Sequence, residues 1–290
     1  MRRVRAEVLN ARRLGAYHSI TIVAPEVAEK VRPGQFVSVA MPQGSTFLLR
    51  RQFSIHQASR RGGWAGTLEF VFEPRGPGTT WLAEVKAHQF LDVIGPIGRA
   101  FAYPTKLSGC LLVAEGHGSA PLYFLGQELR ARGKRVDMLV GAETEDRVFK
   151  PIEGKRLSQT IVITTDDGSL GESGSVFDHL PEVVESTGAR VIYAAGRRPT
   201  LRRIAQFYAE RQIPSQIAVE EEMACGIGLC FSCTVPVIRK DGSGYDNLRA
   251  CVDGPVFNPA RILWDRWLGE DRLRTVTPPE GFPVIRAWPG

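Results

Sequence analysis

The sequence predicts a multidomain protein with an antiparallel β-barrel, a doubly wound α/β domain and a small C-terminal domain built around cysteines. Three observations support this prediction. The first hundred residues read as short strands separated by Pro, Gly and polar turns, which is typical of a small antiparallel barrel. Residues 102–215 then alternate strand-like and helix-like segments, the pattern of a parallel sheet that commonly binds nucleotides. Four of the five cysteines follow, within residues 225–251.

The composition is that of an ordinary globular protein. The chain has 290 residues, 43% hydrophobic and 23% charged, and this length favours two or three domains. Its net charge of +6 raises the question of nucleic acid, but Lys and Arg are scattered in pairs without one basic block with interleaved aromatics. A solvated surface is the favoured interpretation, while docking to an acidic partner or phosphate binding stays open.

The basic N-terminus lacks the apolar run of a secretory signal. No segment reaches the ~18 uninterrupted apolar residues of a membrane span. We therefore expect no membrane span, no nucleic-acid partner and a cytoplasmic location, where cysteines stay reduced unless a metal holds them.

The barrel domain is predicted over residues 1–101. Its first strand-like segment, HSITIVAP, alternates so that Ile20 and Ile22 share one face. Further strand-like segments are GQFVSVAMP, RQFSIHQA, LEFVFEP and FLDVIGPIG.

The α/β domain is predicted over residues 102–215. It opens with CLLVAEG, a continuous apolar run suited to a buried parallel strand, in which Cys110 packs in the core. The strand-like RVDMLVGA, TIVITTDDG and RVIYAAG alternate with the helix-like SAPLYFLGQELRARG, SGSVFDHLPEVVESTG and PTLRRIAQFYAERQ.

The cysteine domain is predicted over residues 216–260. Its cysteines follow a C-x4-C-x2-C spacing, with the fourth seventeen residues after the third; they are Cys225, Cys230, Cys233 and Cys251. This is the spacing of a plant-type 2Fe-2S cluster. Glycines between them allow a loop to wrap closely around the sulfides, and its amide N–H groups can donate to sulfur.

The alternatives to a cluster are weaker. Zinc sites usually present two C-x2-C pairs, and this sequence has one. Disulfides are not expected in a cytoplasmic chain. The acidic run at residues 220–222, before the loop, is interpreted as a solvated face.

Two barrel motifs suit a flavin nucleotide. In RRQFSI (50–55), an Arg at a strand edge can bind a pyrophosphate, and a Ser hydroxyl or backbone N–H can reach a ring nitrogen. In GPGTT (76–80), Gly78 allows close approach and Thr79 can cap a helix. On spacing alone, the favoured interpretations are an ordinary strand edge for the first motif and a turn with a cap for the second.

Taken in order, RRQFSI, GPGTT, GPIGRAF, TTDDGSLGESG and EEMACGIGLCFSC…ACVDGPVF resemble the electron transfer subunit of dihydroorotate dehydrogenase B. That family belongs to the ferredoxin–NADP reductase-like group. The resemblance covers about residues 1–260, and its cysteine segment is highly specific.

The resemblance implies an FAD-binding barrel, an NAD-binding domain and a C-terminal 2Fe-2S domain. It assigns the cluster to the four cysteines and FAD contacts to Arg51, Gln52, Phe53, Ser54, Val71, Phe72, Glu73, Gly78 and Thr79. It also implies an oxidoreductase subunit of pyrimidine biosynthesis in a hetero-oligomer with a catalytic, FMN-containing dehydrogenase. No acid, base or nucleophile stands out, so no catalytic residue is assigned and the partner must supply that chemistry.

The nucleotide loop departs from the pattern of this group. EGHGSAP (115–121) keeps Gly116 and Gly118, which we assign to NAD, but Glu115 replaces the first glycine of Gly-Gly-x-Gly-x-Ala-Pro. A carboxylate there would repel a pyrophosphate. The late Cys-Gly-Pro motif is Ala-Gly-Arg here, ending at Arg197. NADP also stays possible, since arginines surround the next predicted helix, although a basic helix surface is favoured; they are Arg197, Arg198, Arg202 and Arg203.

Two other functions stay open. One is the homologous subunit of another redox complex, of the ferredoxin:NADP transhydrogenase, sulfide dehydrogenase or hydrogenase type. The other is a non-enzymatic subunit with a decayed nucleotide site and zinc. The tail at residues 261–290 has no assigned role, although Trp264, Trp267 and Trp288 could anchor a partner or cover the cluster domain.

Overall fold

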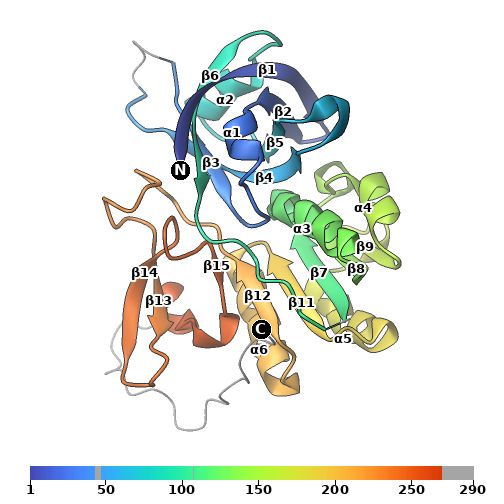
Figure 1. The fold of residues 1–290 in the computed structure, drawn as a ribbon. Coiled ribbons are helices and arrows are strands. Elements are labelled where there is room, and N and C mark those ends of the chain that lie inside the picture. Colours follow the sequence, from blue (N-terminus) through green and yellow to red (C-terminus); the bar gives the residue numbers. More distant parts are fainter. Residues whose placement is uncertain (43–46, 107, 270–290) are drawn as a thin grey trace.

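The computed structural model describes residues 1–42, 47–106 and 108–269. Its N-terminal part is a closed barrel in the order β1-β2-β5-β4-β3-β6, in which every paired strand is antiparallel (Figure 1). The strands are β1 (Arg2–Leu14), β2 (Tyr17–Val23), β3 (Phe36–Val39), β4 (Arg51–Ser59), β5 (Thr67–Phe72) and β6 (Phe90–Ile97), with short helices α1 (Pro25–Ala28) and α2 (Pro77–Ala83). The predicted barrel is confirmed.

Strand β1 is the barrel element that the sequence reasoning did not assign. Its arginines made the N-terminus look like a solvated basic segment. Ala6 and Val8 are nevertheless fully buried and alternate with exposed or half-exposed residues. The alternation of buried and exposed residues that is typical of a strand was therefore present in the sequence. The strand closes the barrel by pairing with both β2 and β6.

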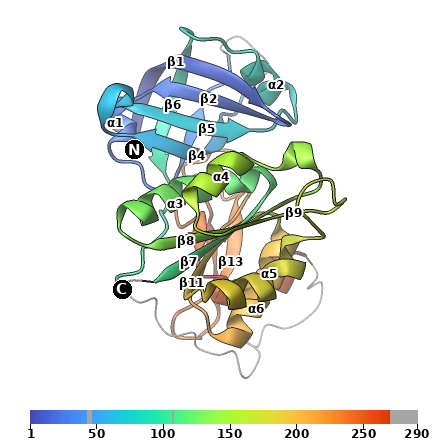
Figure 2. The same ribbon diagram turned by 90° about the vertical axis from the view of Figure 1, so that its right-hand side faces the viewer.

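The central domain is a doubly wound sheet, as predicted. Its strand order is β10-β9-β8-β7-β11-β12-β15, and the strands from β10 to β12 run parallel. Helices α3 and α4 contribute to one hydrophobic core, and α5 and α6 to another (Figure 2). The elements are β7 (Gly109–Glu115), α3 (Ala120–Ala131), β8 (Arg135–Ala142), α4 (Pro151–Leu157), β9 (Ile161–Thr165), β10 (Glu172–Ser173), α5 (Val176–Thr187), β11 (Val191–Ala195), α6 (Arg198–Arg211) and β12 (Ser215–Ala218). Cys110 is fully buried in β7, as expected.

The C-terminal part is a hairpin joined to the large sheet. Strands β13 (Thr234–Ile238) and β14 (Tyr245–Arg249) pair with each other, while β15 (Val256–Phe257) pairs antiparallel with β12. Because β12 ends at Ala218, the sheet extends three residues past the predicted boundary at residue 215.

The start of the predicted tail is packed onto this hairpin. Helix α7 (Trp264–Trp267) buries both of its tryptophans in the core that contains Val235 and Val237. Arg261 Nε also donates to the Ile238 carbonyl at 2.8 Å. Trp264 and Trp267 therefore cover the hairpin, whereas Trp288 lies outside the described residues. Within the described ranges, no helix is both long and apolar enough to cross a bilayer.

A buried polar network joins the barrel to the α/β domain. Lys150, just before α4, contacts Glu69 Oε1 of β5 at 3.0 Å and His56 Nε2 of β4 at 2.9 Å. His56 is fully buried, and its Nδ1 donates to the carbonyl of Ala120 at the start of α3 at 3.2 Å. Burial alone would raise the pKa of Glu69, but the charges of His56 and Lys150 and a hydrogen bond from Ser19 lower it. The network therefore fixes the start of α3 against the barrel wall.

We predict that Lys150→Met lowers the free energy of unfolding by about 3 kcal/mol, because it removes the nearest cation from the buried Glu69 carboxylate and leaves only the more distant Arg12, at 3.9 Å. Urea denaturation of the variant and of wild-type protein measures the difference. Lys155→Met, an exposed lysine on the same helix, is the control and should change stability by less than about 0.5 kcal/mol. Equal stability of the two variants would show that the network contributes little.

Candidate functional site

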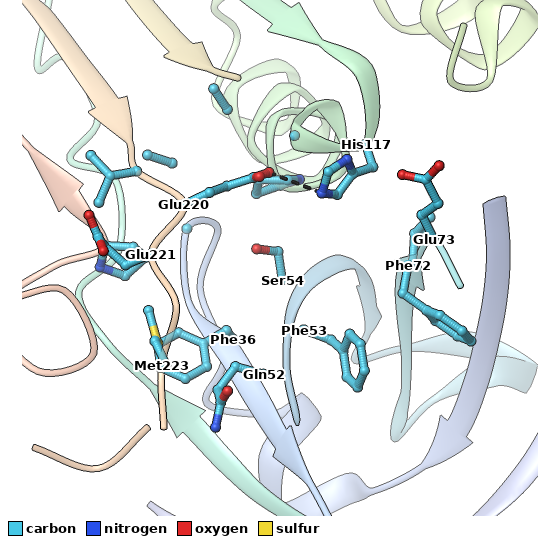
Figure 3. A pocket seen from close by; sticks show the side chains of 18 of the residues that line it. Phe36, Gln52, Phe53, Ser54, Phe72, Glu73, His117, Glu220, Glu221 and Met223 are labelled. Carbon is cyan, nitrogen blue, oxygen red and sulfur yellow. Dashed lines mark ion pairs between the residues drawn. The ribbon is translucent and has the colours of Figure 1, made fainter. Parts of the chain in front are cut away.

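The three parts of the chain meet at one pocket of about 230 Å³. Strands β4 and β5 form one wall, the loop after β7 forms a second, and the segment that follows β12 forms a third (Figure 3). Because β7, β11 and β12 all end here, the pocket lies at the carboxyl edge of the parallel sheet, where ligands of this fold bind.

Most of the predicted flavin residues line this pocket. They are Gln52, Phe53, Ser54, Val71, Phe72, Glu73 and Thr79, and Gly118 of the nucleotide loop joins them. Ser54 lies near the centre, between His117 and Gln52 (Figure 3). The rings of Phe53 and Phe72 instead belong to the barrel core, at 7% and 3% exposure, with Phe53 stacked on Phe70.

The two adjacent arginines of RRQFSI have different environments. Arg50 donates to the carbonyls of Ser38 and Asp92 and to the Asp92 carboxylate, so it ties strands together. Arg51 lies over the first turn of α2, where a Cβ on Gly78 would come 3.4 Å from its Nε. Arg51 Nη1 donates to the Leu49 carbonyl at 2.9 Å, while its Nε and Nη2 face Gly78. Arg51 is therefore the arginine whose Nε and Nη2 are placed to donate to a ligand.

Thr79 caps α2 from inside its first turn, whereas the sequence suggested a cap at its start. Its Oγ1 accepts from the backbone N–H groups of Arg75 and Gly76, at 2.9 and 3.2 Å. Glu73, just before this turn, is held by Arg75 at 2.8 Å and Arg147 at 2.9 Å. Although burial would raise the pKa of Glu73, the two arginines lower it, so a fixed charged wall borders the pocket.

The loop after β7 separates this pocket from a second one of about 210 Å³. Arg75, His117 and Glu220 line both pockets, and Gly116 lines the second. His117 Nε2 lies 3.4 Å from Glu220 Oε1. Burial would raise the pKa of Glu220, but the hydrogen bond from His117 and the charges of His117 and Arg75 lower it. Sequence reasoning missed Glu220, although its position just after a parallel strand was a usable signal.

The acidic run at residues 220–222 is not a uniform solvated face. Glu220 faces the pockets, and Glu221 accepts from the Trp267 indole at 2.5 Å and pairs with Arg198 at 2.8 Å. Burial raises the pKa of Glu221. Glu220 and Glu222 are both exposed, as expected, whereas the Glu221 side chain is only 7% exposed.

The arginines around α6 form ion pairs rather than an open basic surface. Arg197 pairs with Glu115, Arg198 with Glu221, Arg202 with Asp265 and Arg203 with Asp178. The basic patch considered for an extra nucleotide phosphate is thus balanced by carboxylates.

The hairpin brings distant cysteines together. Cys233 directly precedes β13 and Cys251 follows β14, and the Ala250 N–H donates to the Cys233 carbonyl at 2.7 Å. Burial, followed by a hydrogen bond and the charge of Cys233, raises the pKa of Cys251 to about 12. Hydrogen bonds with Ser232 and then Cys225 lower the pKa of Cys230 to about 6. The charge of Cys225 also raises the pKa of Cys251, so all four thiols lie close enough to influence one another.

The cysteine loop has the glycine conformations and amide donors that the sequence suggested. Gly226 and Gly228 adopt φ values of +68° and +87°, which side chains rarely tolerate. The amides of Ile227 and Leu229 donate to Cys225 Sγ at 3.5 and 3.3 Å. Among the described residues, no three His, Cys, Asp or Glu side chains surround one point suited to a single metal ion.

The cysteine loop touches the flavin motif directly. A Cβ on Gly226 would lie 2.7 Å from Gln52 Nε2, so only glycine fits there. Met223, two residues before Cys225, lines the same pocket as Gln52. The pocket and the cysteine loop are therefore adjacent.

Apolar side chains surround the cysteine loop on its outer side. Leu229 is 76% exposed and Phe231 is 59% exposed, with Ile227 and Val252 also open to solvent. Phe231 has a φ of +57°, a left-handed conformation that costs a non-glycine residue about 1–2 kcal/mol. Strain of this kind is concentrated at functional sites.

Comparisons with known proteins agree with this arrangement. Residues 220–263 match the family model of the iron-sulfur cluster binding domain of dihydroorotate dehydrogenase B. The electron transfer subunit of dihydroorotate dehydrogenase B (NAD(+)) from Desulforamulus reducens is 34% identical over 242 residues, covering 83% of this chain and 90% of that one. The corresponding subunit from Bacillus mycoides is 37% identical over 235 residues, covering 80% and 86%.

Solved structures show the same fold. A structure of an NADH-dependent reduced ferredoxin-NADP oxidoreductase, described in a study of flavin-based electron bifurcation, matches with 26% identity and a TM-score of 0.78, covering 93% of this chain and 94% of that chain. A ferredoxin NADP+ reductase from Neisseria gonorrhoeae, at 16% identity and a TM-score of 0.57, shares the fold over 72% of this chain and 91% of its own. The chain therefore belongs to the family of dihydroorotate dehydrogenase B electron transfer subunits.

Proposed function

We propose that this protein is the electron transfer subunit of a dihydroorotate dehydrogenase that uses NAD. It holds FAD in the pocket beside β4 and a 2Fe-2S cluster on its four C-terminal cysteines, and a partner subunit oxidises dihydroorotate. The observation that carries the proposal is the contact of Gln52 with Gly226, because it sets the flavin motif directly against the cysteine loop.

The cysteine loop fits a two-iron cluster. Such a cluster takes four thiolates, and the fold brings the four cysteines close enough that the pKa values of Cys230 and Cys251 respond to neighbouring thiols. Amide donors to Cys225 Sγ stabilise a thiolate.

The larger pocket fits a flavin nucleotide. Ser54 and the β4 backbone lie in its centre, and Arg51 beside Gly78 offers a guanidinium for the pyrophosphate. The second pocket, lined by Gly116 after β7 and Gly196 after β11, suits a nicotinamide dinucleotide at the carboxyl edge of the sheet.

When bound, FAD supplies exchange of a hydride on one side and of single electrons on the other, and the cluster supplies single electrons. The side chains of this protein orient these groups and bind the proton that is exchanged when a hydride is converted into single electrons. A hydride equals two electrons and one proton, so each conversion moves one proton. His117 Nε2 and Glu220 Oε1 stand between the two pockets and can hold that proton.

The partner docks on the apolar rim of the cysteine loop. The rim consists of Ile227, Leu229, Phe231 and Val252, which are all exposed. Interface centres are rich in such residues and poor in charge. Since no residue in the pocket acts as acid or base on an organic substrate, that chemistry belongs to the partner, and the pair forms a hetero-oligomer.

A second candidate is the corresponding subunit of a ferredoxin:NADP-type redox complex. It is favoured by the 0.78 TM-score to the reduced ferredoxin-NADP oxidoreductase structure. Co-purification decides between them. A partner that contains FMN and supports dihydroorotate-dependent NAD reduction would support the first function, and a partner that lacks this activity would support the second.

The first prediction concerns the cofactors. Protein purified without oxygen should show flavin and iron–sulfur absorption that bleaches on addition of NADH, because the dinucleotide pocket adjoins the flavin pocket. Visible spectroscopy measures the bleaching, with dithionite as the control for complete reduction. Protein that holds neither flavin nor iron would contradict the proposal. Cofactors that dithionite reduces and NADH does not would contradict the proposed use of NAD.

The second prediction concerns the ligands of the cluster. Cys251→Ser should reduce iron and acid-labile sulfide to less than about half of the wild-type content, because one thiolate of the set is lost. Flavin content should stay unchanged, since Cys251 does not line the pocket. Cys110→Ala, in the core of the α/β domain, is the control. Retention of full iron and sulfide in Cys251→Ser would exclude this cysteine as a ligand.

The third prediction concerns docking. Leu229→Ser should weaken binding of the partner subunit by about tenfold, since exposed apolar residues at an interface centre contribute about 1–2 kcal/mol each. Calorimetry with the purified subunits measures the dissociation constant, and the visible spectrum confirms that the cluster remains. Ile152→Ser, which changes an equally exposed residue on α4, should bind normally. Equal affinities for the two variants would place the interface elsewhere.

A further inference from the structure

The two residues that depart from the reductase pattern are in contact with each other. Glu115 ends β7 and Arg197 follows β11, and these strands are neighbours that pair Ala114 with Ala195. Glu115 Oε1 accepts from Arg197 Nη2 at 2.5 Å, and Glu115 Oε2 accepts from the Arg197 backbone N–H at 3.1 Å. The carboxylate that would repel a phosphate is therefore engaged by a cation.

The surrounding backbone is shaped to hold Glu115. A Cβ on Gly196 would lie 2.8 Å from Glu115 Cβ, and a Cβ on Gly118 would lie 3.1 Å from the Gly196 nitrogen. Only 8% of the Glu115 side chain is exposed. The loops after β7 and β11 thus pack closely around the carboxylate, which fixes its position.

Arg197 extends across the carboxyl edge of the sheet. Besides Glu115, its guanidinium lies 3.3 Å from Glu143, after β8, and 3.7 Å from Asp166, after β9. Because the strand order is β9-β8-β7-β11, this side chain spans the ends of several strands. It remains 55% exposed and lines the second pocket with Gly116.

This geometry places a guanidinium where a phosphate group would approach. An Arg has five N–H donors in a planar fork. Arg197 Nη2 donates to Glu115 and Nη1 donates to Glu143, which leaves further N–H groups of the exposed guanidinium for a second anion. A purely structural ion pair would not require the cation to stand open in a pocket. The side chain is also held in place before a ligand arrives, which lowers the entropy cost of binding.

We propose that Glu115 and Arg197 form one unit in which Arg197 binds a phosphate of the dinucleotide and Glu115 is the positioning residue that holds Arg197. The proposal rests on the NAD-linked function above. In this protein, the Arg197 side chain would contact the phosphate. The loop at residues 115–121 lacks the first glycine of the reductase pattern.

The carboxylates around Arg197 give the unit a selectivity. Glu115, Glu143 and Asp166 carry three negative charges around Arg197, and Arg147, 3.7 Å from Glu143, adds a second positive charge, so the carboxylates remain in excess by one. An additional phosphate brings about two further negative charges, and like charges at short range disfavour binding. The pocket around Arg197, at the carboxyl edge of the sheet, should therefore bind NAD+ more tightly than NADP+.

The test measures dissociation constants for NAD+, NADP+ and ADP-ribose by calorimetry on the oxidised, cofactor-loaded protein. Arg197→Gln should weaken NAD+ and ADP-ribose binding by about tenfold, and Glu115→Gln by about threefold, because the former loses the charged donor and the latter only its anchor. Asp166→Asn should narrow the preference for NAD+ over NADP+. Arg203→Gln, an Arg on α6 paired with Asp178, is the matched control and should bind as wild type does.

The outcomes separate this proposal from the one on which it rests. Wild-type affinity in Arg197→Gln would overturn the phosphate contact, and tighter binding would show that Arg197 obstructs the edge. A loss for NAD+ without a loss for ADP-ribose would place Arg197 on the nicotinamide part and overturn the phosphate assignment. Wild-type protein that holds flavin and iron yet binds no dinucleotide would overturn the NAD-linked function together with this unit. Unchanged flavin content and melting temperature confirm that each variant is folded.

Discussion

The docking of the barrel onto the α/β domain is the constraint on which the site depends. Neither domain forms the pocket alone, because β4 and β5 supply one wall and the loop after β7 supplies another. The buried contacts of Lys150 with Glu69 and His56 cross this boundary, and His56 also holds the carbonyl of Ala120, where α3 begins. A charge buried at an interface is costly when it loses its partner. The same groups that join the domains therefore also fix the nucleotide loop in register with the flavin motif.

The cysteine domain depends on the sheet in a similar way. Strand β15 extends the sheet at β12, and Glu221 ties the connecting segment to Arg198 and Trp267. The cysteine loop is thereby held against Gln52 through Gly226, which has no side chain to keep them apart. Close approach of the flavin pocket and the cysteine loop suits a protein that passes electrons between them. The outer side of the loop then carries an apolar rim that is open to solvent.

The fold and most of the candidate site could be predicted from the sequence. The alternation of apolar residues predicted the barrel, and the long apolar run around Cys110 predicted a buried parallel strand. Strand β1 was not predicted, because its many arginines made the segment look polar although the buried Ala6 and Val8 alternate with exposed residues. The interpretation of the acidic run as a solvated face is correct for the exposed Glu220 and Glu222 and wrong for Glu221. The partners of this run are distant in sequence, and only the fold brings His117 to Glu220 and Arg198 to Glu221.

The sequence by itself determined the class of cofactor chemistry and the order of the domains. Cysteine spacing and glycine positions act over a few residues, so local sequence is enough to specify the loop that Cys225, Cys230 and Cys233 share. Tertiary structure decided how groups far apart in the chain neutralise one another. Glu115 read as a defect in the nucleotide loop, yet 82 residues later the chain supplies Arg197 at the end of a neighbouring strand. Electrostatic interaction depends on distance in space, and only the pairing of β7 with β11 makes that distance short.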